Sequence, residues 1–309
     1  AFAFLSQILA FLRDRLLAHI FGAGPELDIY YTAFRIPDFI FVTVASVVSV
    51  SVLVPFIVEK GGEAKEELKR FIDNVFTFFG WLILLISIIA FFAMPFLSKA
   101  LFSGLDPVSL EKVITLSRIL LLSPIFLGFS NLLGSITQAY NRFFLYALAP
   151  LLYNSGIILG ILLLGERMGV RGVVWGVVLG AFLHAFIQWP FVYRQGLAPR
   201  FSFRIDWQTL RKVASVSIPR TLTLSLSSLI LILLVALASQ MDSGSVSVLS
   251  LSINLQSVPL SLIGVSYSLA AFPTLSRCFQ EKNLEAFLEQ MRISTKFIFF
   301  WTLPLTALY

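Results

Sequence analysis

The stretch FIDNVFTFFGWLILLISIIAFFAMPFL, residues 71–97, decides the class of fold. No charged residue lies between Val75 and Leu97, and about 20 apolar residues suffice for a helix to cross the hydrocarbon core of a bilayer. The 309-residue chain as a whole is 58% hydrophobic and only 13% charged. Soluble domains contain roughly 45–50% apolar and about 25% charged residues, so a soluble core could not hide this surplus. We therefore predict an all-α, polytopic membrane protein.

Polar breaks divide the apolar sequence into nine candidate membrane-spanning segments. They are residues 1–21, 29–58, 71–97, 113–140, 143–164, 172–193, 213–239, 246–275 and 293–309. The chain opens within one apolar run, AFAFLSQILAF, and closes within another, FWTLPLTALY. We therefore expect it to be part of a longer protein.

The distribution of Lys and Arg predicts the orientation of these segments. One set of alternate loops (59–70, 141–142, 194–212 and 276–296) carries 14 Lys and Arg residues, and the other set carries 4. Because cytoplasmic loops of membrane proteins are enriched in Lys and Arg, the N-terminus is predicted to lie in the cytoplasm. The net charge of +6 therefore reflects topology, and we expect no nucleic-acid partner.

The second and eighth segments resemble each other, which predicts an internal repeat. Pro37 and Pro259 lie inside the two segments, and Pro55 and Pro273 lie near their far ends. The copies are six segments apart in the chain, an even offset that gives both the same orientation, as in parallel-repeat transporters. The intact protein should then have at least twelve spans, with the first, second, seventh and eighth lining a central cavity.

The repeat also predicts how the chain is divided. We expect a six-helix bundle over residues 1–194, a cytoplasmic connecting loop over 195–212, and the first part of a second bundle, helices seven to nine, over 213–309.

Polar residues of the first segment fall on one helical face. Ser6 and Arg13 are seven residues apart, as are Gln7 and Asp14, and seven residues are close to two helical turns. Ionisable residues inside a membrane nearly always face a bundle interior or a water-filled cavity. Gln7, Arg13 and Asp14 are therefore candidate substrate-binding residues, as is Arg35 just before the proline of the second segment. The alternative is a structural ion pair, or side chains that extend toward the lipid headgroups.

The eighth segment carries an uninterrupted polar face, whose members recur at steps of three and four. They are Ser243, Ser247, Ser250, Asn254, Ser257 and Ser261. This face indicates either close helix packing through small residues or a hydrophilic wall along a transport path, with Ser250, Asn254 and Ser257 as candidate binding residues. Polar residues of the seventh segment also lie on roughly one side. They are Ser217, Arg220, Thr221 and Ser228, and Arg220 is either a cavity residue or one that extends to the cytoplasmic headgroups.

The sequence lacks the motifs of soluble catalysis, so we do not expect an enzyme. It has no glycine-rich nucleotide loop, and its two His and single Cys give no metal-ligand spacing. We expect His184 to be a packed or hydrogen-bonded residue and Cys278 to be an ordinary free thiol. A transporter of this composition must draw on a gradient, on the membrane potential or on a partner, and needs no bound cofactor.

Several segments resemble the MviN/MurJ family of bacterial lipid II flippases, within the multidrug/oligosaccharidyl-lipid/polysaccharide exporter superfamily. LRDRLLAHIFGAGPELDIYYTAFRIPDF, residues 12–39, is similar to the first two helices of that family. Residues 238–277 resemble its seventh-to-eighth helix region, with GSVS, a proline and a terminal PTLS, and PLLYNSGIIL and VYRQGLAPRFSF fit later segments.

This resemblance implies fourteen helices in two bundles around a cationic cavity, in the bacterial cytoplasmic membrane. It implies outward movement of a lipid-linked peptidoglycan precursor by alternating access, driven by Na⁺ or the membrane potential. The partners would be this anionic, lipid-linked glycan and the surrounding lipids. By position, Arg13, Asp14, Asp28 and Arg35 match family residues and are implied to act in substrate binding. Guanidinium groups suit a pyrophosphate-linked headgroup because they bind phosphate oxygens in a fork.

The sequence also departs from the family pattern at positions where the family carries cavity charges. The substituting residues are Gln7, Phe41, Val42, Ser46, Val47, Ile253 and Asn254. Three expected cavity arginines are absent, which leaves other functions open. The alternatives are an exporter of another polyprenyl-linked oligosaccharide, a cation-coupled exporter of small molecules, and a membrane paralogue that transports nothing.

Overall fold

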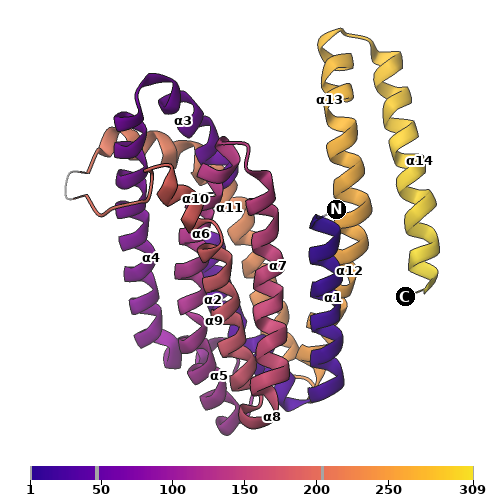
Figure 1. Cartoon of the computed structure of the whole chain (residues 1–309). Coiled ribbons are helices and arrows are strands. Elements are labelled where there is room, and N and C mark those ends of the chain that lie inside the picture. The colour runs from indigo at the N-terminus through magenta and orange to yellow at the C-terminus, as the bar shows by residue number, and fades with distance from the viewer. Residues whose placement is uncertain (1, 46–48, 203–204, 309) are drawn as a thin grey trace. The chain divides into compact units, whose positions relative to one another are not determined.

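The structure is a computed structural model that describes residues 2–45, 49–202 and 205–308. The chain forms two compact units, Ala1–Leu249 and Ser250–Tyr309. Every regular element among the described residues is a helix, which confirms the predicted all-α class (Figure 1). The predicted division into bundles at residues 195–212 stays a prediction.

The first unit contains most of the helices. Their bounds are α1 Phe2–Phe21, α2 Pro25–Ile40, α3 Val50–Glu63, α4 Lys65–Leu101, α5 Pro107–Leu120, α6 Leu122–Ala139, α7 Phe143–Leu159, α8 Gly165–Met168, α9 Val170–Phe186, α10 Trp189–Arg194 and α11 Trp207–Ala238. Two π-helical turns interrupt them, η1 (Phe41–Ala45) and η2 (Gly160–Leu164). Helix α12 (Ser245–Pro259) begins in this unit, and α11 packs against α2, η1 and α4.

The second unit continues α12 and adds three elements. These are the π-helical turn η3 (Leu260–Val265), α13 (Ser266–Gln280) and α14 (Leu284–Leu308). Helix α13 packs antiparallel to α14 across a short turn at Lys282 (Figure 1). Within the described residues, each of the nine predicted segments is helical.

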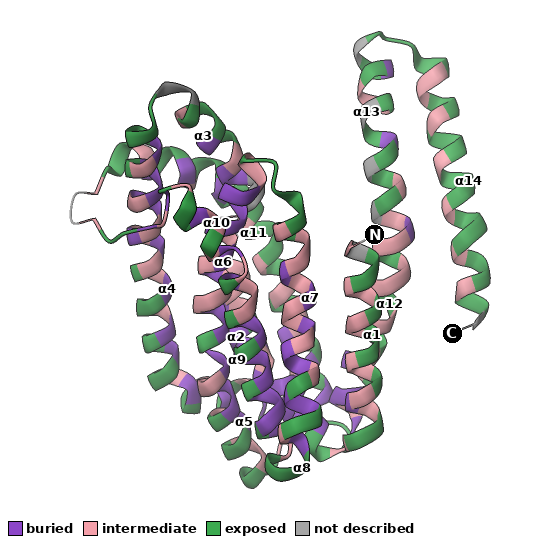
Figure 2. Cartoon of the chain, in the orientation of Figure 1, coloured by how far each residue is buried: buried purple, intermediate pink, exposed green. Residues whose placement is uncertain are grey.

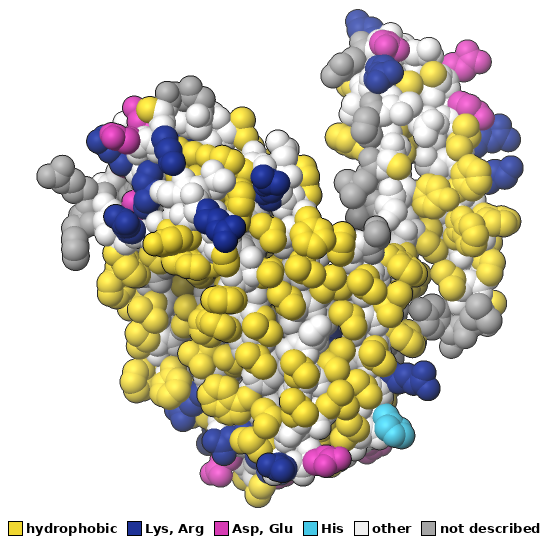
Figure 3. Space-filling model, in the orientation of Figure 1, with side chains coloured by type: hydrophobic (Ala, Val, Ile, Leu, Met, Phe, Trp, Pro, Cys, Tyr) yellow, Lys and Arg dark blue, Asp and Glu magenta, His cyan; other side chains and the backbone are white. Residues whose placement is uncertain are grey.

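Six helices are long and apolar enough to cross a membrane by length and composition. They are Lys65–Leu101, Pro107–Ala139, Phe143–Met168, Val170–Arg194, Trp207–Ala238 and Ser245–Phe279. The protein is therefore a multi-pass membrane protein, while the predicted number of nine spans stays a prediction. Figure 3 shows hydrophobic side chains covering the middle of the first unit, with Lys and Arg side chains gathered toward its ends.

Acidic residues start two of these helices. The carboxylate of Asp106 accepts hydrogen bonds from the main-chain N–H groups of Val108 and Ser109, and Asp206 accepts from those of Gln208 and Thr209. Such caps satisfy N–H groups that have no partner within the helix. The bonds from Thr209, side chain and main chain, hold the pKa of Asp206 below its ordinary value.

A polar pair fixes the loop that leads into α11. Buried Asn74 of α4 donates its amide to the carbonyl of Asp206 at 3.1 Å and accepts from the N–H of Asp206 at 3.0 Å. This reciprocal pair places the start of α11 against α4, and it explains why α11 begins at Trp207 rather than at residue 213.

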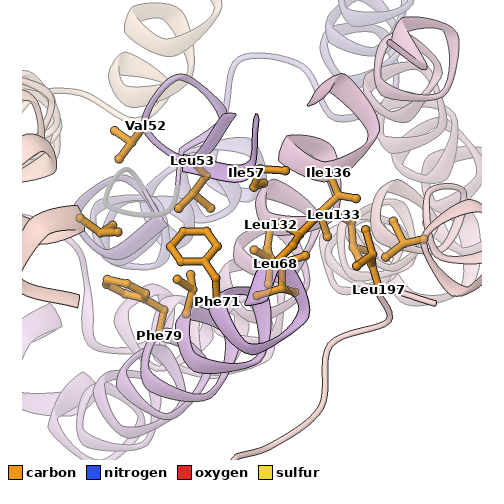
Figure 4. Packing of buried hydrophobic residues seen from close by; sticks show 14 of the residues in the cluster. Val52, Leu53, Ile57, Leu68, Phe71, Phe79, Leu132, Leu133, Ile136 and Leu197 are labelled. Carbon is orange, nitrogen blue, oxygen red and sulfur yellow. The ribbon is translucent and has the colours of Figure 1, made fainter. Parts of the chain in front are cut away.

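A hydrophobic core lies at one end of the first unit, where α3, α4 and α6 meet. Figure 4 shows Leu53 and Ile57 of α3 packed with Phe71 of α4 and Leu133 of α6. Leu197, beyond α10, closes the same cluster and is fully buried. Figure 2 shows that α4 buries only one face and exposes the other along its length.

The two repeat helices share an irregularity. The π-helical turn η1 follows Pro37, and η3 follows Pro259; Phe41 and Leu260, their first residues, are 219 positions apart. Proline removes an N–H donor and displaces the carbonyl one turn before it, so a widened turn nearby is expected. The two copies of the predicted repeat thus share a π-helical turn as well as the proline before it.

The closest helix crossing in the first unit joins α7 and η2 to α9. A Cβ on Gly160 would lie 2.5 Å from the Cα of Gly176, and a Cβ on Gly156 would lie 2.4 Å from the Cα of Gly180. Only glycine permits this approach. Membrane helices associate through such small-residue spacings because lipid supplies no hydrophobic drive between them.

Candidate functional site

Helix α1 carries the first predicted site residues on its less exposed face. Gln7, Arg13 and Asp14 are partly buried, whereas Ile8 and Phe11 are 45% and 48% exposed. Burial therefore confirms the shared face predicted from the seven-residue spacing. Substrate binding by these residues stays a prediction.

Arg13 is held in place by two neighbours. Its Nε donates to Oδ1 of Asp14 at 2.9 Å, and its Nη2 lies 2.8 Å from the same oxygen. Its Nη1 donates to Oδ1 of Asn154 on α7 at 3.1 Å, and the Asn154 amide in turn donates to the carbonyl of Pro150. A guanidinium has five N–H donors, so these contacts with described residues leave two for an external acceptor.

A second group of charges lies on α2. Arg35 is buried to 9% exposure, and Asp38, three residues further on, is exposed. Asp38 lies within electrostatic range of both Arg35 and Arg13, so it belongs to the same charged region. The sequence prediction did not include Asp38 among the site residues, although its spacing of three from Arg35 is the signal that could have found it.

Asp28 has a structural partner that the sequence did not predict. Its Oδ2 accepts the N–H of Gly244 at 2.6 Å, and its Oδ1 accepts the N–H of Ser247 at 2.7 Å and the Ser247 hydroxyl at 2.5 Å. Gly244 has φ +96°, a conformation that favours glycine, and a Cβ there would meet the carbonyl of Ala23 at 2.7 Å. The buried Asp28 carboxylate thus caps the start of α12 and ties it to α2, and substrate contact by Asp28 stays a prediction.

Arg220 is not joined to the Arg13 group. It is exposed, while Ser217 on the same helix is fully buried and donates to the carbonyl of Val213. The buried polar stripe of α11 continues to Ser225, whose hydroxyl lies 3.0 Å from that of Thr43 in η1. No hydrogen bond or ion pair links Arg220 to another residue in the described part of the chain.

The predicted polar face of α12 is also the less exposed face of that helix. Ser250 is buried and Asn254 and Ser257 are partly buried, whereas Val248 is 54% exposed. The Ser257 hydroxyl donates to the carbonyl of Asn254 at 2.6 Å. These three residues belong to the second unit. The phase of the stripe was predictable, and its role stays a prediction.

His184 anchors a polar network that the sequence only partly predicted. Its Nδ1 lies 2.6 Å from the Ser130 hydroxyl of α6, which also receives the Gln188 amide at 2.7 Å. The Gln188 oxygen accepts the Thr137 hydroxyl at 3.2 Å. His184 is a hydrogen-bonded residue, as expected, and Gln188 is fully buried. The network fixes α6 to α9 and α10.

The positions that depart from the family pattern provide no replacement cations. Phe41 and Val42 lie in η1 and Ile253 in α12, all partly buried, while Ser46 and Val47 fall outside the described residues. The described residues also contain no group of three or more His, Cys, Asp or Glu side chains that could hold a metal ion. Arg13 and Arg35 carry positive charge in this region, and anion binding by them stays a prediction.

Comparison with known proteins gives one family. The family model described as "Lipid II flippase MurJ" matches residues 17–309. The chain is 26% identical over 326 residues to the lipid II flippase MurJ of Burkholderia cenocepacia, covering 99% of this chain and 63% of that protein. It is 34% identical over 162 residues to the lipid II flippase MurJ of Thermosipho africanus, covering 52% and 33% respectively. The chain thus spans less than two thirds of the length of these curated relatives.

Solved structures give the same fold. The structure described as "Lipid II flippase MurJ, inward closed conformation" superposes with a TM-score of 0.81 at 25% identity, over 98% of this chain and 62% of that one. An inward-facing MATE family transporter superposes with a TM-score of 0.77 at 19% identity, over 97% and 69%. The second likeness shows the fold alone.

Proposed function

We propose, since the chain belongs to the MurJ family of lipid II flippases, that it moves lipid II, a lipid-linked peptidoglycan precursor, across the bacterial cytoplasmic membrane. The mechanism would be alternating access, in which a central site opens to one side of the membrane at a time. The chain covers 63% of its relative from Burkholderia cenocepacia, so this is an activity of the whole protein to which the chain contributes the described helices.

The observation that carries the proposal is the geometry of Arg13. Asp14 and Asn154 orient its guanidinium on the inner face of α1, and two N–H donors remain. Phosphate oxygens are the acceptors that such a fork binds best, and the headgroup of lipid II is joined through a pyrophosphate. Arg35 adds a second positive charge in the same region.

The orientation belongs to the same proposal. The 14-to-4 distribution of Lys and Arg supports a cytoplasmic N-terminus, which puts the turns that contain Gly24 and Gly244 on the outer side. Asp28 joins these two turns, so its contacts would close the outer side of the path while the inner side is open. Separation of these turns would be the step that exposes the site outward, with Na⁺ or the membrane potential as the source of energy.

The test is binding of lipid II to the purified protein in nanodiscs. Each hydrogen bond to a charged group contributes about 1.5–3 kcal/mol, so loss of two bonds in Arg13→Ala should weaken lipid II binding by at least about 100-fold. Arg13→Lys keeps the positive charge but lacks the forked pair of N–H donors. Its affinity for lipid II should lie between those of the wild type and Arg13→Ala. Arg171→Ala, which removes an exposed charge at the predicted outer end, is the control. Equal affinities for wild type and Arg13→Ala would contradict the proposal.

One observation favours a second function, a cation-coupled exporter. Asp38 is an exposed carboxylate within the α2 span, and Phe41 and Val42 stand where relatives carry positive charge. A site with fewer cations and an exposed carboxylate suits a less acidic substrate, such as a small cationic molecule. If lipid II does not bind but cells still require the protein, this function or a non-transporting role replaces the first.

A further inference from the structure

An apolar pocket lies on the outer surface of the first unit, away from the charged region. Its volume is about 290 Å³, and it lies between η1, α4, α6 and the loop before α11. Its walls include Phe76 and Gly80 of α4, Phe129 of α6 and Ala45 of η1. Trp81 and Phe201, 58% and 61% exposed, form its rim with their ring centroids 6.0 Å apart.

The depth of the pocket matches one leaflet of a bilayer. Helix α4 carries no charge from Val75 to Leu97, a rise of about 33 Å at 1.5 Å per residue, close to the roughly 30 Å of a hydrocarbon core. Val75 therefore lies at one edge of the hydrocarbon. The pocket extends from Val75 to Leu84, about 13.5 Å along the helix, which is nearly half of that core.

The edge at Val75 is also the cationic end of the pocket. Lys69 and Asp73 continue the same helical stripe as Phe76 and Gly80, and they form an ion pair. The Asp73 carboxylate also accepts the N–H of Arg200 at 2.7 Å, which fixes the loop next to Phe201. Lys69 and Asp73 offset each other, so the exposed guanidinium of Arg200 leaves a net positive charge at the headgroup level.

We propose that this pocket binds one acyl chain of an anionic glycerophospholipid from the cytoplasmic leaflet, with the lipid phosphate on Arg200. The inference rests on the predicted cytoplasmic location of the N-terminus for the choice of leaflet, and it is independent of lipid II transport. An acyl chain of leaflet length fits a pocket of this depth, whereas a long polyprenyl chain would project beyond it. A basic residue next to the hydrocarbon edge selects anionic headgroups.

The pocket adjoins the irregular part of the second predicted span. Ala45 of η1 lines it, and the Ala45 carbonyl accepts the Asn131 amide of α6 at 3.4 Å. On the other side of η1, Thr43 contacts Ser225 of α11. A bound acyl chain would fill the space beside this π-helical turn and hold it against α6, so the lipid acts as a structural ligand of the bent span.

The test is native mass spectrometry of the purified chain with dioleoylphosphatidylglycerol or dioleoylphosphatidylcholine. Gly80 lines the pocket and nothing lies within 4 Å of a Cβ built there, so Gly80→Leu has room for its Cβ and should fill part of the pocket, and its melting temperature checks that the fold is kept. We expect the wild type to prefer phosphatidylglycerol about fivefold, the difference that one basic residue near the surface provides. Gly80→Leu should weaken binding of both lipids at least about tenfold.

Arg200→Gln tests the contribution of the lipid headgroup to binding separately from that of the acyl chain. It should abolish the preference for phosphatidylglycerol while phosphatidylcholine still binds, and Arg171→Gln, which removes an exposed charge at the other end of the unit, should leave the preference intact. Equal binding of both lipids by the wild type, or unchanged binding by Gly80→Leu with an unchanged melting temperature, would overturn the proposal. A shift in oligomeric state with Gly80→Leu alone would instead assign the pocket to a second copy of the chain.

Discussion

The carboxylate of Asp28 should hold the starts of α2 and α12 together, and Asp28→Asn tests this. The buried carboxylate accepts three hydrogen bonds, one on Oδ2 and two on Oδ1. Asparagine can keep only one acceptor oxygen, and its NH₂ group would then face the N–H of Gly244 or of Ser247. Asp28→Asn has the same shape as the wild type, so its effect reports charge and hydrogen bonding rather than packing.

The magnitude follows from the bonds that change. Loss of one hydrogen bond to a charged group costs about 1.5–3 kcal/mol, and the other bonds weaken toward the 0.5–1.5 kcal/mol, roughly, of neutral pairs. The favourable interaction of a negative charge with the start of α12 is also lost, about 0.3–1 kcal/mol. The sum is about 3 kcal/mol, or about a 100-fold increase in the population in which the two turns are separated.

Thiol labelling measures that population. Val246, a fully buried residue in the first turn of α12, is replaced by Cys in a Cys278→Ser background, and the rate of labelling by a membrane-impermeant reagent is recorded. We expect about 100-fold faster labelling with Asp28→Asn than without it, because the rate follows the open population. Asp242→Asn, which removes an exposed charge from the same turn, should change the rate less than about twofold. Equal rates with and without Asp28→Asn would refute the reasoning, and so would an equal effect of Asp242→Asn.

Three other substitutions give definite expectations. Gly176→Leu should lower the melting temperature of the protein strongly, whereas Gly80→Ala should not. The reason is that a Cβ on Gly176 would lie 2.6 Å from the backbone of the facing helix, whereas a Cβ on Gly80 meets nothing within 4 Å. Equal melting temperatures of the two variants would contradict this crossing. Asn154→Leu should weaken lipid II binding about fivefold because it removes one contact that orients Arg13. In the Arg13→Ala background the same substitution should not weaken lipid II binding further. Additive losses of affinity in the double variant would show that Asn154 acts independently of Arg13. Hydrogen bonds lower the pKa of Asp206 in the folded state. The contribution of Asp206 to stability is therefore present above the ordinary carboxyl pKa near 4, and it is lost as the pH falls through the lower pKa of the folded state. Thermal melts of Asp206→Asn between about pH 2 and pH 6 should lack that part of the wild-type pH dependence.

The sequence was sufficient for the class of fold and for the faces of single helices. Apolar run lengths predicted where helices lie, and the seven-residue spacing of Gln7 and Asp14 predicted the less exposed face of α1. The prolines that predicted the repeat, Pro37 and Pro259, precede the π-helical turns η1 and η3. These features depend on the period of one helix and on local backbone chemistry, which a sequence contains directly.

The sequence was insufficient for the pairing of residues on different helices. Gly176 lies opposite Gly160, and Asp28 lies opposite Ser247, 219 residues away in the chain. Periodicity indicates that a face is buried but not which helix covers it. The glycines at 172, 176 and 180, spaced by four, were a visible sign of a close crossing, but the sign does not identify the partner helix.

The charged residues of the first two spans fall into two groups when their hydrogen bonds are compared. Asp28 and Arg13 look alike in the sequence, since each is an ionisable residue at a position where the family carries one. The start of α12 already provides three donors to the two oxygens of Asp28, so this carboxylate joins α2 to α12. Arg13 is oriented by contacts that engage three of its five donors, so it can bind an anion without losing them. An intramembrane carboxylate whose two oxygens both accept from another helix therefore indicates a joint between helices, whereas a guanidinium that is held in place with donors to spare can still take an anion.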